Sequence, residues 1–311
     1  MNTTLKFKTL VEFLEYFKDE DACLAYFASI RFRNGRYCPH CGCTRIYAFK
    51  DGKRYRCAKC QQDFTIKTKT VFGESKLPLK KWFVAIYLLT THNKGISSVQ
   101  LAKQIGVTQK TAWFMDHRIR SAMKQNKGKL FGTIEMDETY VGGLEKNKHS
   151  VKRVKGTQGR NHKTKTPVLG LIQRGGEVRA TVAENCKMIT IESHIIQHAK
   201  FGSQLYTDDF LSYGRIGKYY PHEVVKHAKG QYVRDGNIHS NSIESFWALF
   251  KRGYHGIYHH MSRKHLQRYV DEFSYRFNRR ADSFQEIFSD LVEHVSTSAK
   301  LPYKELTIQP T

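Results

Sequence analysis

Residues 133–143 read TIEMDETYVGG, and their pattern sets the interpretation of the second half of the chain. Apolar residues alternate with others at its start, which predicts a strand with one buried face. Asp137 lies inside this strand, although acidic residues are disfavoured in strands. Asp208 has a similar setting, at the end of a second predicted strand within SQLYTDDF, residues 203–210. Two carboxylates in strands therefore require an explanation.

The elements predicted around these strands indicate a mixed α/β domain. After the first strand the pattern predicts, in order, a hairpin turning at Gly175-Gly176, a helix near 190–200, the Asp208 strand, a strand at 222–227, a helix from about Asn241, and helices at 263–281 and 283–295. The basic, glycine-containing stretch 144–166 is expected to form a mobile loop, and it carries no motif that assigns it a role.

A third carboxylate, Glu244, lies in the first turn of the helix that begins near Asn241. If the two strands are adjacent and this helix packs over them, Glu244 converges with Asp137 and Asp208. Three like charges repel one another unless cations neutralise them, and oxygen-only ligands suit Mg²⁺. Two Mg²⁺ ions about 4 Å apart would activate an attacking oxygen and stabilise a leaving one in phosphoryl transfer. The three acids thus predict a magnesium-dependent site.

Each acid also has a purely structural explanation. Asp208 could cap the segment that follows it, and any of the acids could pair with one of the many lysines. The N-x-x-E pattern from Asn241 to Glu244 resembles a capping box, in which the glutamate accepts the N-cap amide. Lys251 lies about 10 Å further along nearly the same helix face, where it could hold a DNA phosphate or simply face solvent. The residues alone leave these alternatives open.

The charge of the whole chain points to a polyanionic partner. Lys and Arg number 52 against 28 Asp and Glu, and the isoelectric point is about 9.7. So many positive charges repel one another unless a polyanion neutralises them, and nucleic acid is the usual polyanionic partner. A generic basic surface would give the same composition and is the alternative. No stretch approaches the ~18 apolar residues of a membrane span, and the N-terminus lacks the apolar core of a signal peptide. We therefore expect a cytoplasmic protein without a membrane partner.

The seven cysteines favour metal ligation over disulfides in a chain of this kind. Residues 37–65, YCPHCGCTRIYAFKDGKRYRCAKCQQDFT, contain two C-x-x-C pairs separated by short β-like stretches. Together the pairs can supply four thiolates to one tetrahedral zinc ion and close a ribbon too small to fold on apolar burial alone. Cys43 could compete as a ligand, whereas Cys23 and Cys186 are expected to be ordinary buried thiols. The predicted zinc ligands are Cys38, Cys41, Cys57 and Cys60.

Three predicted helices follow the ribbon, and the last two have the pattern of a helix-turn-helix. The short helix SSVQLAKQIG is joined by a turn at Gly106 to a longer helix capped by Thr108. Packing of the apolar positions leaves the first turn of the longer helix exposed, where base edges are normally read. The pattern is loose, and a helical linker without a DNA role is the alternative. The predicted DNA-reading residues are Gln109, Lys110 and Thr111.

Taken together, these segments resemble the DDE-type transposases of bacterial insertion sequences, in the superfamily numbered fifteen ninety-five. The resemblance covers nearly the whole chain, and its most specific parts are MDETYVGG, YTDDFLSY and HSNSIESFWALFKRGYHGIYHH. It implies a ribonuclease H-like catalytic core with a metal-binding triad of Asp137, Asp208 and Glu244. Lys251 fills the basic position that follows the triad, and Lys251 and Arg252 are expected to contact DNA.

The resemblance also implies an activity. The enzyme would bind terminal inverted repeats, free a 3′-OH by attack of water, and join that 3′-OH to target DNA without a covalent enzyme intermediate. The expected cofactors are two Mg²⁺ ions, with Mn²⁺ as a substitute, and one structural Zn²⁺. The expected partners are double-stranded terminal-repeat and target DNA and further copies of the chain, in a nucleoid-associated complex in the bacterial cytoplasm.

Other functions remain as alternatives. A non-catalytic regulator built from the ribbon and the helix-turn-helix would need no acidic triad, and a structure-specific nuclease would keep the triad without strand transfer. A serine or tyrosine recombinase is disfavoured, because Tyr254 and Tyr258 lack a clear arginine cluster.

The predicted architecture is multidomain. N-terminal helices and a small zinc ribbon occupy residues 1–72, and a helix-turn-helix domain occupies 73–127. An α/β ribonuclease H-like catalytic domain, with a mixed sheet flanked by helices, spans 128–296, and 297–311 forms a C-terminal tail.

Overall fold

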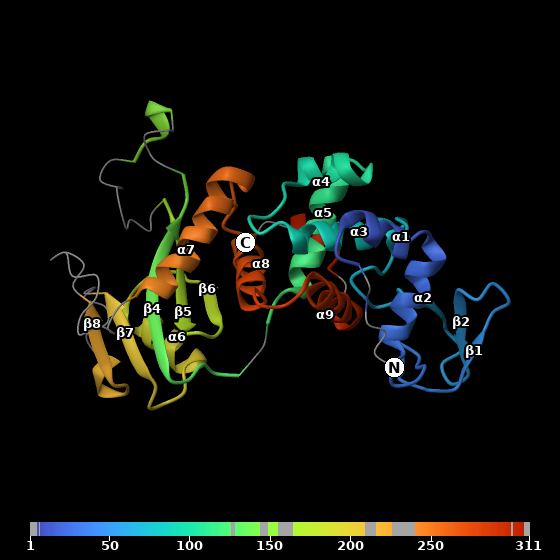
Figure 1. The fold of residues 1–311 in the computed structure, drawn as a ribbon, viewed down its shortest axis with the longest axis horizontal. Coiled ribbons are helices and arrows are strands. Elements are labelled where there is room, and N and C mark those ends of the chain that lie inside the picture. The colour runs from blue at the N-terminus through green and yellow to red at the C-terminus, as the bar shows by residue number, and fades with distance from the viewer. Residues whose placement is uncertain are drawn as a thin grey trace. The chain divides into compact units, whose positions relative to one another are not determined.

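The computed structural model describes residues 5, 7–125, 128–143, 149–154, 164–208, 216–225, 240–299 and 301–307. Contacts between residues divide the chain into two compact units. Unit 1 comprises residues 1–123 and 281–311, and unit 2 comprises residues 124–280. Figure 1 shows the elements of both units.

Unit 1 is built mainly from helices that surround a core of aromatic side chains. The helices are α1 (Leu10–Tyr16), α2 (Glu20–Arg31), α3 (Leu79–Thr91), α4 (Ser98–Ile105), α5 (Gln109–Ala122), α9 (Phe284–Thr297) and α10 (Tyr303–Thr307). Several of these helices begin at a capping residue. Thr9 and Glu12 form a capping box at the start of α1, and the Asp19 side chain accepts the Ala22 amide at the start of α2.

A small antiparallel sheet completes unit 1, in the order β1 (Ile46–Ala48), β2 (Arg54–Cys57) and β3 (Asp63–Thr65). The segment that leaves β3 is fastened to α2 by Arg31, whose guanidinium donates to the carbonyls of Ile66 and Thr68. Arg118 of α5 donates to the carbonyls of Val71 and Gly73. The ribbon and the helices that follow it therefore form one compact unit.

The predicted domain boundary at residue 296 placed helix α9 in the catalytic domain, and the structure differs from this prediction. The helix belongs to unit 1, where it contacts α2, α3 and α5. The Phe288 ring lies 5.4 Å from that of Phe13 and 5.5 Å from that of Phe83. The tail also packs in this unit, since Tyr303 lies 5.5 Å from Phe114 of α5. The amphipathic pattern of α9 predicts a buried face but does not say which core receives it.

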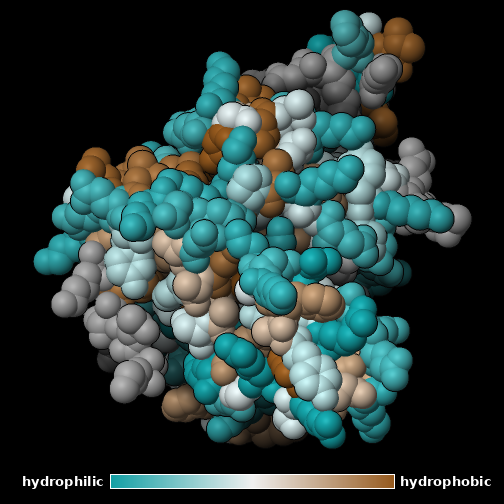
Figure 2. All heavy atoms as spheres, turned by 90° about the vertical axis from the view of Figure 1, so that its right-hand side faces the viewer, coloured by the Kyte–Doolittle hydropathy of each residue, from teal (hydrophilic) through white to brown (hydrophobic). Residues whose placement is uncertain are grey.

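The surface agrees with the polar composition of the chain. Hydrophilic side chains cover most of the face shown in Figure 2, and hydrophobic ones form small separate patches. Exposed large apolar residues in unit 1 include Leu10, Val11 and Leu14 of α1. Within the described part of the chain, no helix combines the length and the hydrophobicity needed to cross a membrane.

Unit 2 is organised by one sheet whose strands lie in the order β6-β5-β4-β7-β8. Strands β4 and β5 pair antiparallel, as do β5 and β6, whereas β4 pairs parallel with β7, and β7 with β8. The long first strand of the unit is therefore central. The strands are β4 (Thr133–Val141), β5 (Thr166–Gln173), β6 (Val178–Val182), β7 (Gln204–Asp208) and β8 (His222–Val225).

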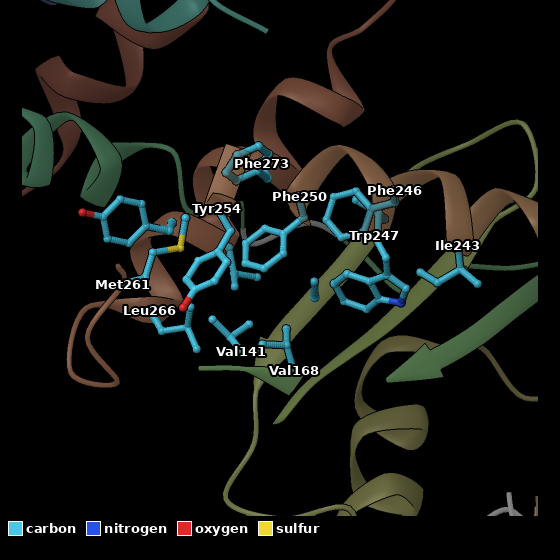
Figure 3. Close-up of a cluster of buried hydrophobic side chains, with 14 of the residues drawn as sticks. Val141, Val168, Ile243, Phe246, Trp247, Phe250, Tyr254, Met261, Leu266 and Phe273 are labelled. Atoms are coloured by element: carbon cyan, nitrogen blue, oxygen red, sulfur yellow. The ribbon is translucent and has the colours of Figure 1, made fainter. Parts of the chain in front are cut away.

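Helices cover both faces of this sheet. One face carries α7 (Asn241–Gly253) and α8 (Leu266–Asn278), as Figure 1 shows. Their apolar side chains pack on Val168 and Ile172 of β5, and Figure 3 shows Val168 in this cluster. The other face carries α6 (Met188–His198), which packs on Ile134 and Met136 of β4. Short helical turns lie at η2 (Ser150–Lys152), η4 (Ile216–Lys218) and the π-helical η6 (Tyr254–Tyr258).

The edge strand β6 is protected by side chains of α8. Gln267 Oε1 accepts the Val182 amide and Asn278 Oδ1 accepts the Val178 amide, both at 2.7 Å. These bonds satisfy groups that would otherwise invite pairing with another strand. The mixed five-stranded sheet flanked by helices confirms the predicted ribonuclease H-like core that follows a zinc ribbon and helices.

Candidate active site and metal centres

The four predicted zinc ligands lie together in the ribbon. Their sulfur atoms are all within 4.8 Å of one another, with 3.7 Å between Cys38 and Cys60 and 3.5 Å between Cys41 and Cys57. Each C-x-x-C pair folds as a turn that directs amides at sulfur: His40 N donates to Cys38 Sγ, and Cys60 N donates to Cys57 Sγ. Such a set of four thiolates fits one tetrahedral zinc ion.

The amides around Cys57 favour its thiolate form. Hydrogen bonds from the amides of Cys60 and Lys59 lower the pKa of the Cys57 thiol to about 6. Cys43 is outside the four-sulfur cluster and donates instead to the carbonyl of Arg45. Cys23 is fully buried, as predicted, and burial raises the pKa of its thiol to about 12; Cys186 is half-buried.

The predicted DNA-reading residues begin α5. Gly106 ends α4 in the left-handed conformation with φ 62°, and Thr108 caps α5 by accepting the amide of Thr111. Gln109 is exposed and donates to Ser98 Oγ at 2.8 Å. Lys110 is exposed, with its ammonium 5.1 Å from the centre of the Tyr303 ring.

Adjacent parallel strands bring Asp137 and Asp208 together. Glu135 of β4 pairs with Tyr206 of β7, and the two aspartates each follow two residues later along parallel strands. Carboxylate oxygens of Asp137, Asp208 and Glu138 all lie within 4.8 Å of one another. Sequence reasoning missed Glu138, because strict alternation assigns it to the opposite face from Asp137. Its position next to Asp137 was the only signal that could have indicated it.

The carboxylates of this site repel one another. Burial is the largest of the causes that raise the pKa of Asp137 to about 7, and the nearby charges of Glu138, Asp208 and Glu244 contribute in the same direction. A buried acid among like charges favours its protonated form unless a cation is present. The donor set, made of carboxylate oxygens, is of the kind that Mg²⁺ takes. The residues present therefore fit the expected metal.

Glu244 lies in the first turn of α7, one position beyond that of a capping-box glutamate, because the helix begins one residue earlier than its sequence pattern predicts. The N-cap residue is Ser240, and its side chain caps no amide in the described structure. Glu244 is exposed, and its Oε1 accepts the Ser240 hydroxyl at 3.3 Å. Its charge reaches Asp137, although its carboxylate is outside the compact cluster of three. Asp209 and Asp235, the other acids considered for this role, lie outside the described residues.

The amides at the start of α7 are capped by a residue from the sheet. Glu135 Oε2 accepts the amides of Ser242 and Ile243 at 2.8 and 3.0 Å. Glu135 is completely buried, and it also accepts the Arg174 guanidinium at 2.8 Å. Sequence reasoning missed this glutamate too, although a second acid two positions before Asp137 in the same strand was a signal of the same kind.

A glycine allows α7 to lie close to the sheet beside Asp137. Gly170 of β5 is the register partner of Asp137. A Cβ atom at Gly170 would lie 2.6 Å from Cζ2 of Trp247, which is shorter than real contacts of this kind. The indole of Trp247 therefore rests on the glycine, and Figure 3 shows it next to Ile243 on the same helix.

The predicted basic residues stand at the other end of α7. Lys251 and Arg252 are both exposed in its last turn. They follow the buried face made by Phe246, Trp247 and Phe250, so that one helix carries an acid at its start and cations at its end.

Comparison with known proteins connects these features to a family. Residues 129–278 match the model of the ISXO2-like transposase domain, and residues 18–63 match that of the transposase zinc-ribbon domain. The chain is also similar to an uncharacterized protein in transposable element ISH50 of Halobacterium salinarum. The two are 32% identical over 251 residues, which cover 77% of this chain and 84% of the relative.

Proposed function

Because the chain belongs to the IS1595 family of insertion-sequence transposases, we propose that it binds terminal inverted repeats and catalyses metal-dependent cleavage and strand transfer. The observation that carries the proposal is the convergence of Asp137, Glu138 and Asp208 on two parallel strands. A regulator that only binds DNA has no use for a half-buried aspartate whose pKa is raised by burial and by like charges, because such a site destabilises the fold.

The proposed metal ligands are Asp137, Asp208 and Glu244, with Glu138 as an additional carboxylate at the same place. Two Mg²⁺ ions, or Mn²⁺ in their place, would supply Lewis acidity at the scissile phosphate. The protein's own part is to keep the carboxylates together and to position DNA. Attack of water breaks the P–O3′ bond and leaves a 3′-OH, which then attacks a target phosphate in line and displaces the target's 3′ oxygen.

Recognition of DNA is assigned to both units. In unit 1 the start of α5, with Gln109, Lys110 and Thr111, would read the terminal repeat, while the zinc ribbon supports this unit. In unit 2, Lys251 and Arg252 at the end of α7 would hold phosphates of the engaged strand. Pairing of two ends by further copies of the chain in a nucleoid-associated complex is part of the same proposal.

A strand-transfer assay tests the function. Purified protein is mixed with a labelled terminal-repeat duplex, a supercoiled target plasmid and Mg²⁺. We expect labelled target molecules that depend on the metal and on a 3′-OH at the transferred end. Cleaved duplex without joined product would favour the structure-specific nuclease, and binding without either product would favour the regulator.

Two variants make the assay specific. Asp208→Asn should bind the duplex yet give no joined product. Glu15→Gln alters an exposed acid of α1, in unit 1, and should behave as the wild type. Equal activity in Asp208→Asn and Glu15→Gln would overturn the assignment of the site.

A further inference from the structure

We propose that Glu135 and Arg174 are positioning residues of the active site, which hold the start of α7 on the sheet and so place Glu244 beside the other proposed metal ligands. The inference rests on the proposed function for the role of Glu244. It goes beyond that function by assigning a task to two residues that no sequence motif singled out.

The first support is the set of contacts that Glu135 makes. Its two carboxylate oxygens accept the amides of Ser242 and Ile243 and the hydroxyl of Ser242, at 2.8, 3.0 and 3.0 Å. A helix start has several amides without partners, and a carboxylate there also interacts favourably with the helix dipole. These are the amides that an N-cap side chain usually accepts, and the side chain of the N-cap residue Ser240 accepts neither of them. Glu135 therefore takes the place of an N-cap side chain and ties the start of α7 to β4.

The second support is burial. Glu135 has no exposed surface, and a buried carboxylate is costly unless it is both paired and hydrogen-bonded. Arg174 supplies the opposite charge at 2.8 Å and is itself 23% exposed. The arrangement is therefore complete only when strand, helix and arginine are all in place.

The third support is the place of Glu135 in the strand. Residues two apart in a strand point to the same face, about 7 Å apart. Glu135 and Asp137 therefore lie on the same face of β4, the face covered by α7. One strand thus provides a proposed metal ligand and also fixes the helix that carries another. A shift of α7 relative to the sheet would change the distance between Glu244 and Asp137.

Arg174 extends the arrangement to the neighbouring strands. Its amide donates to the Thr133 carbonyl at 3.0 Å, which fixes it at the start of β4. Its guanidinium lies 4.7 Å from the centre of the Tyr206 ring, two residues before Asp208 on β7. The same arginine therefore contacts the strand of each proposed aspartate ligand and the glutamate that holds α7.

The test compares Glu135→Gln with Glu177→Gln. Gln lacks the charge that pairs with Arg174. It also has only one side-chain oxygen, so it cannot accept all the hydrogen bonds that Glu135 accepts. Glu177 forms an ion pair of the same kind with Arg179, at 2.7 Å, within the β5–β6 hairpin. Three quantities are measured: Mn²⁺ binding by electron paramagnetic resonance to protein that is free of Mg²⁺ but keeps its zinc, hydrogen exchange of the first α7 turn, and the Mg²⁺ concentration for half-maximal strand transfer.

For Glu135→Gln we expect faster exchange at Ser242 and Ile243, and Mn²⁺ affinity reduced by about 10- to 100-fold, as for other residues that orient metal ligands. The half-maximal Mg²⁺ concentration should rise accordingly, and activity should recover at high Mg²⁺. Glu177→Gln should change none of these. If Glu135→Gln fails to fold, Arg174→Lys, a milder change at a partly exposed site, should show the same pattern with smaller amplitude.

Faster exchange with unchanged Mn²⁺ affinity and unchanged metal dependence would show that Glu135 is only a helix cap, and would overturn the proposal. If the wild-type protein gives no strand transfer, the proposed function fails. Mn²⁺ binding and exchange still decide the positioning role in that case, because neither needs DNA.

Discussion

The two proposed metal centres of this chain are built in opposite ways. The zinc centre is local: its four cysteines lie between Cys38 and Cys60 and meet through two tight turns. The carboxylates of the other centre meet on β4 and β7, and the proposed third ligand comes from the start of α7, which contacts a buried glutamate and lies over a glycine under a tryptophan. A local centre can be read from spacing, whereas an assembled one depends on the packing of a whole unit. Removing a cysteine ligand should therefore unfold the zinc ribbon, whereas removing a carboxylate ligand should abolish catalysis and leave the fold intact.

The largest expected effect is loss of the zinc centre. Structural zinc contributes on the order of 10 kcal/mol to the folding of isolated zinc modules. Cys57→Ser should lose zinc, unfold the ribbon and abolish preference for terminal-repeat DNA. Zinc content by elemental analysis and competition binding measure the two effects. Freshly purified wild-type protein without zinc would contradict the assignment.

The next effect is on catalysis. Asp137→Asn, Asp208→Asn and Glu244→Gln should each lower strand transfer by at least ~1000-fold, and pairs of them should lose little more, since residues that act as a unit are not additive. Terminal-repeat binding should stay near normal, and thermal unfolding should show that each variant is folded and no less stable than the wild type. Near-normal strand transfer in Glu244→Gln would remove this residue from the triad, and the third ligand would then be sought first at Glu138.

A third test measures the free energy of unfolding of the protein without Mg²⁺ but with its zinc, which is called metal-free below. Asp137 keeps its proton up to about pH 7 in the folded chain but loses it near its ordinary pKa of 3.8 when unfolded. The folded state thus binds more protons between these values, so the stability of the metal-free protein should fall as pH rises from about 4 to 7. Asp137→Asn should stabilise metal-free protein at pH 7.5 by up to ~4 kcal/mol, with the gain shrinking toward pH 4.

Mg²⁺ is the control for that test. Added Mg²⁺ should stabilise the wild type at pH 7.5, because binding to the folded state alone raises its stability. It should have little effect on Asp137→Asn. Equal responses of the two proteins to Mg²⁺ would place the ion elsewhere.

A smaller effect on stability and activity is expected from a substitution of Gly170 in the sheet. Gly170→Ala places a methyl group 2.6 Å from the Trp247 indole, so the helix or the indole must move. Overpacking of this kind destabilises by about 1–3 kcal/mol. Denaturant unfolding and strand transfer should both report it, with activity falling more than stability alone explains. Gly217→Ala, at a glycine with open space around it, is the matched control.

The smallest effect concerns the end of α7. Lys251→Ala should weaken binding of any DNA severalfold and reduce the salt dependence of binding by about one phosphate contact. Gln109→Ala should instead reduce discrimination between the terminal repeat and random DNA. Fluorescence anisotropy over a salt series distinguishes the two outcomes. Wild-type binding and strand transfer in Lys251→Ala would exclude the proposed phosphate contact.

Sequence reasoning succeeded where the signal was short-range or where a residue type was out of place. The cysteine spacing indicated the ribbon, and acids inside strands drew attention to Asp137 and Asp208, which the structure places side by side. It could not supply partners that arise only from packing. Nothing within the sequence of α7 shows that Glu135, far earlier in the chain, accepts its first amides. The same limit explains α9, whose buried face could have matched either unit.

The placement of α9 has a consequence for biosynthesis. Unit 1 is discontinuous: its last part, residues 281–311, is made after the whole of unit 2. The aromatic core that receives Phe288 is therefore incomplete until the ribosome has passed unit 2 and has made α9. Fragments truncated within or just after unit 2 would carry the ribbon and α5 without the helix that completes their core. Premature termination would then yield polypeptides in which the unit that carries the proposed DNA-reading residues is incomplete.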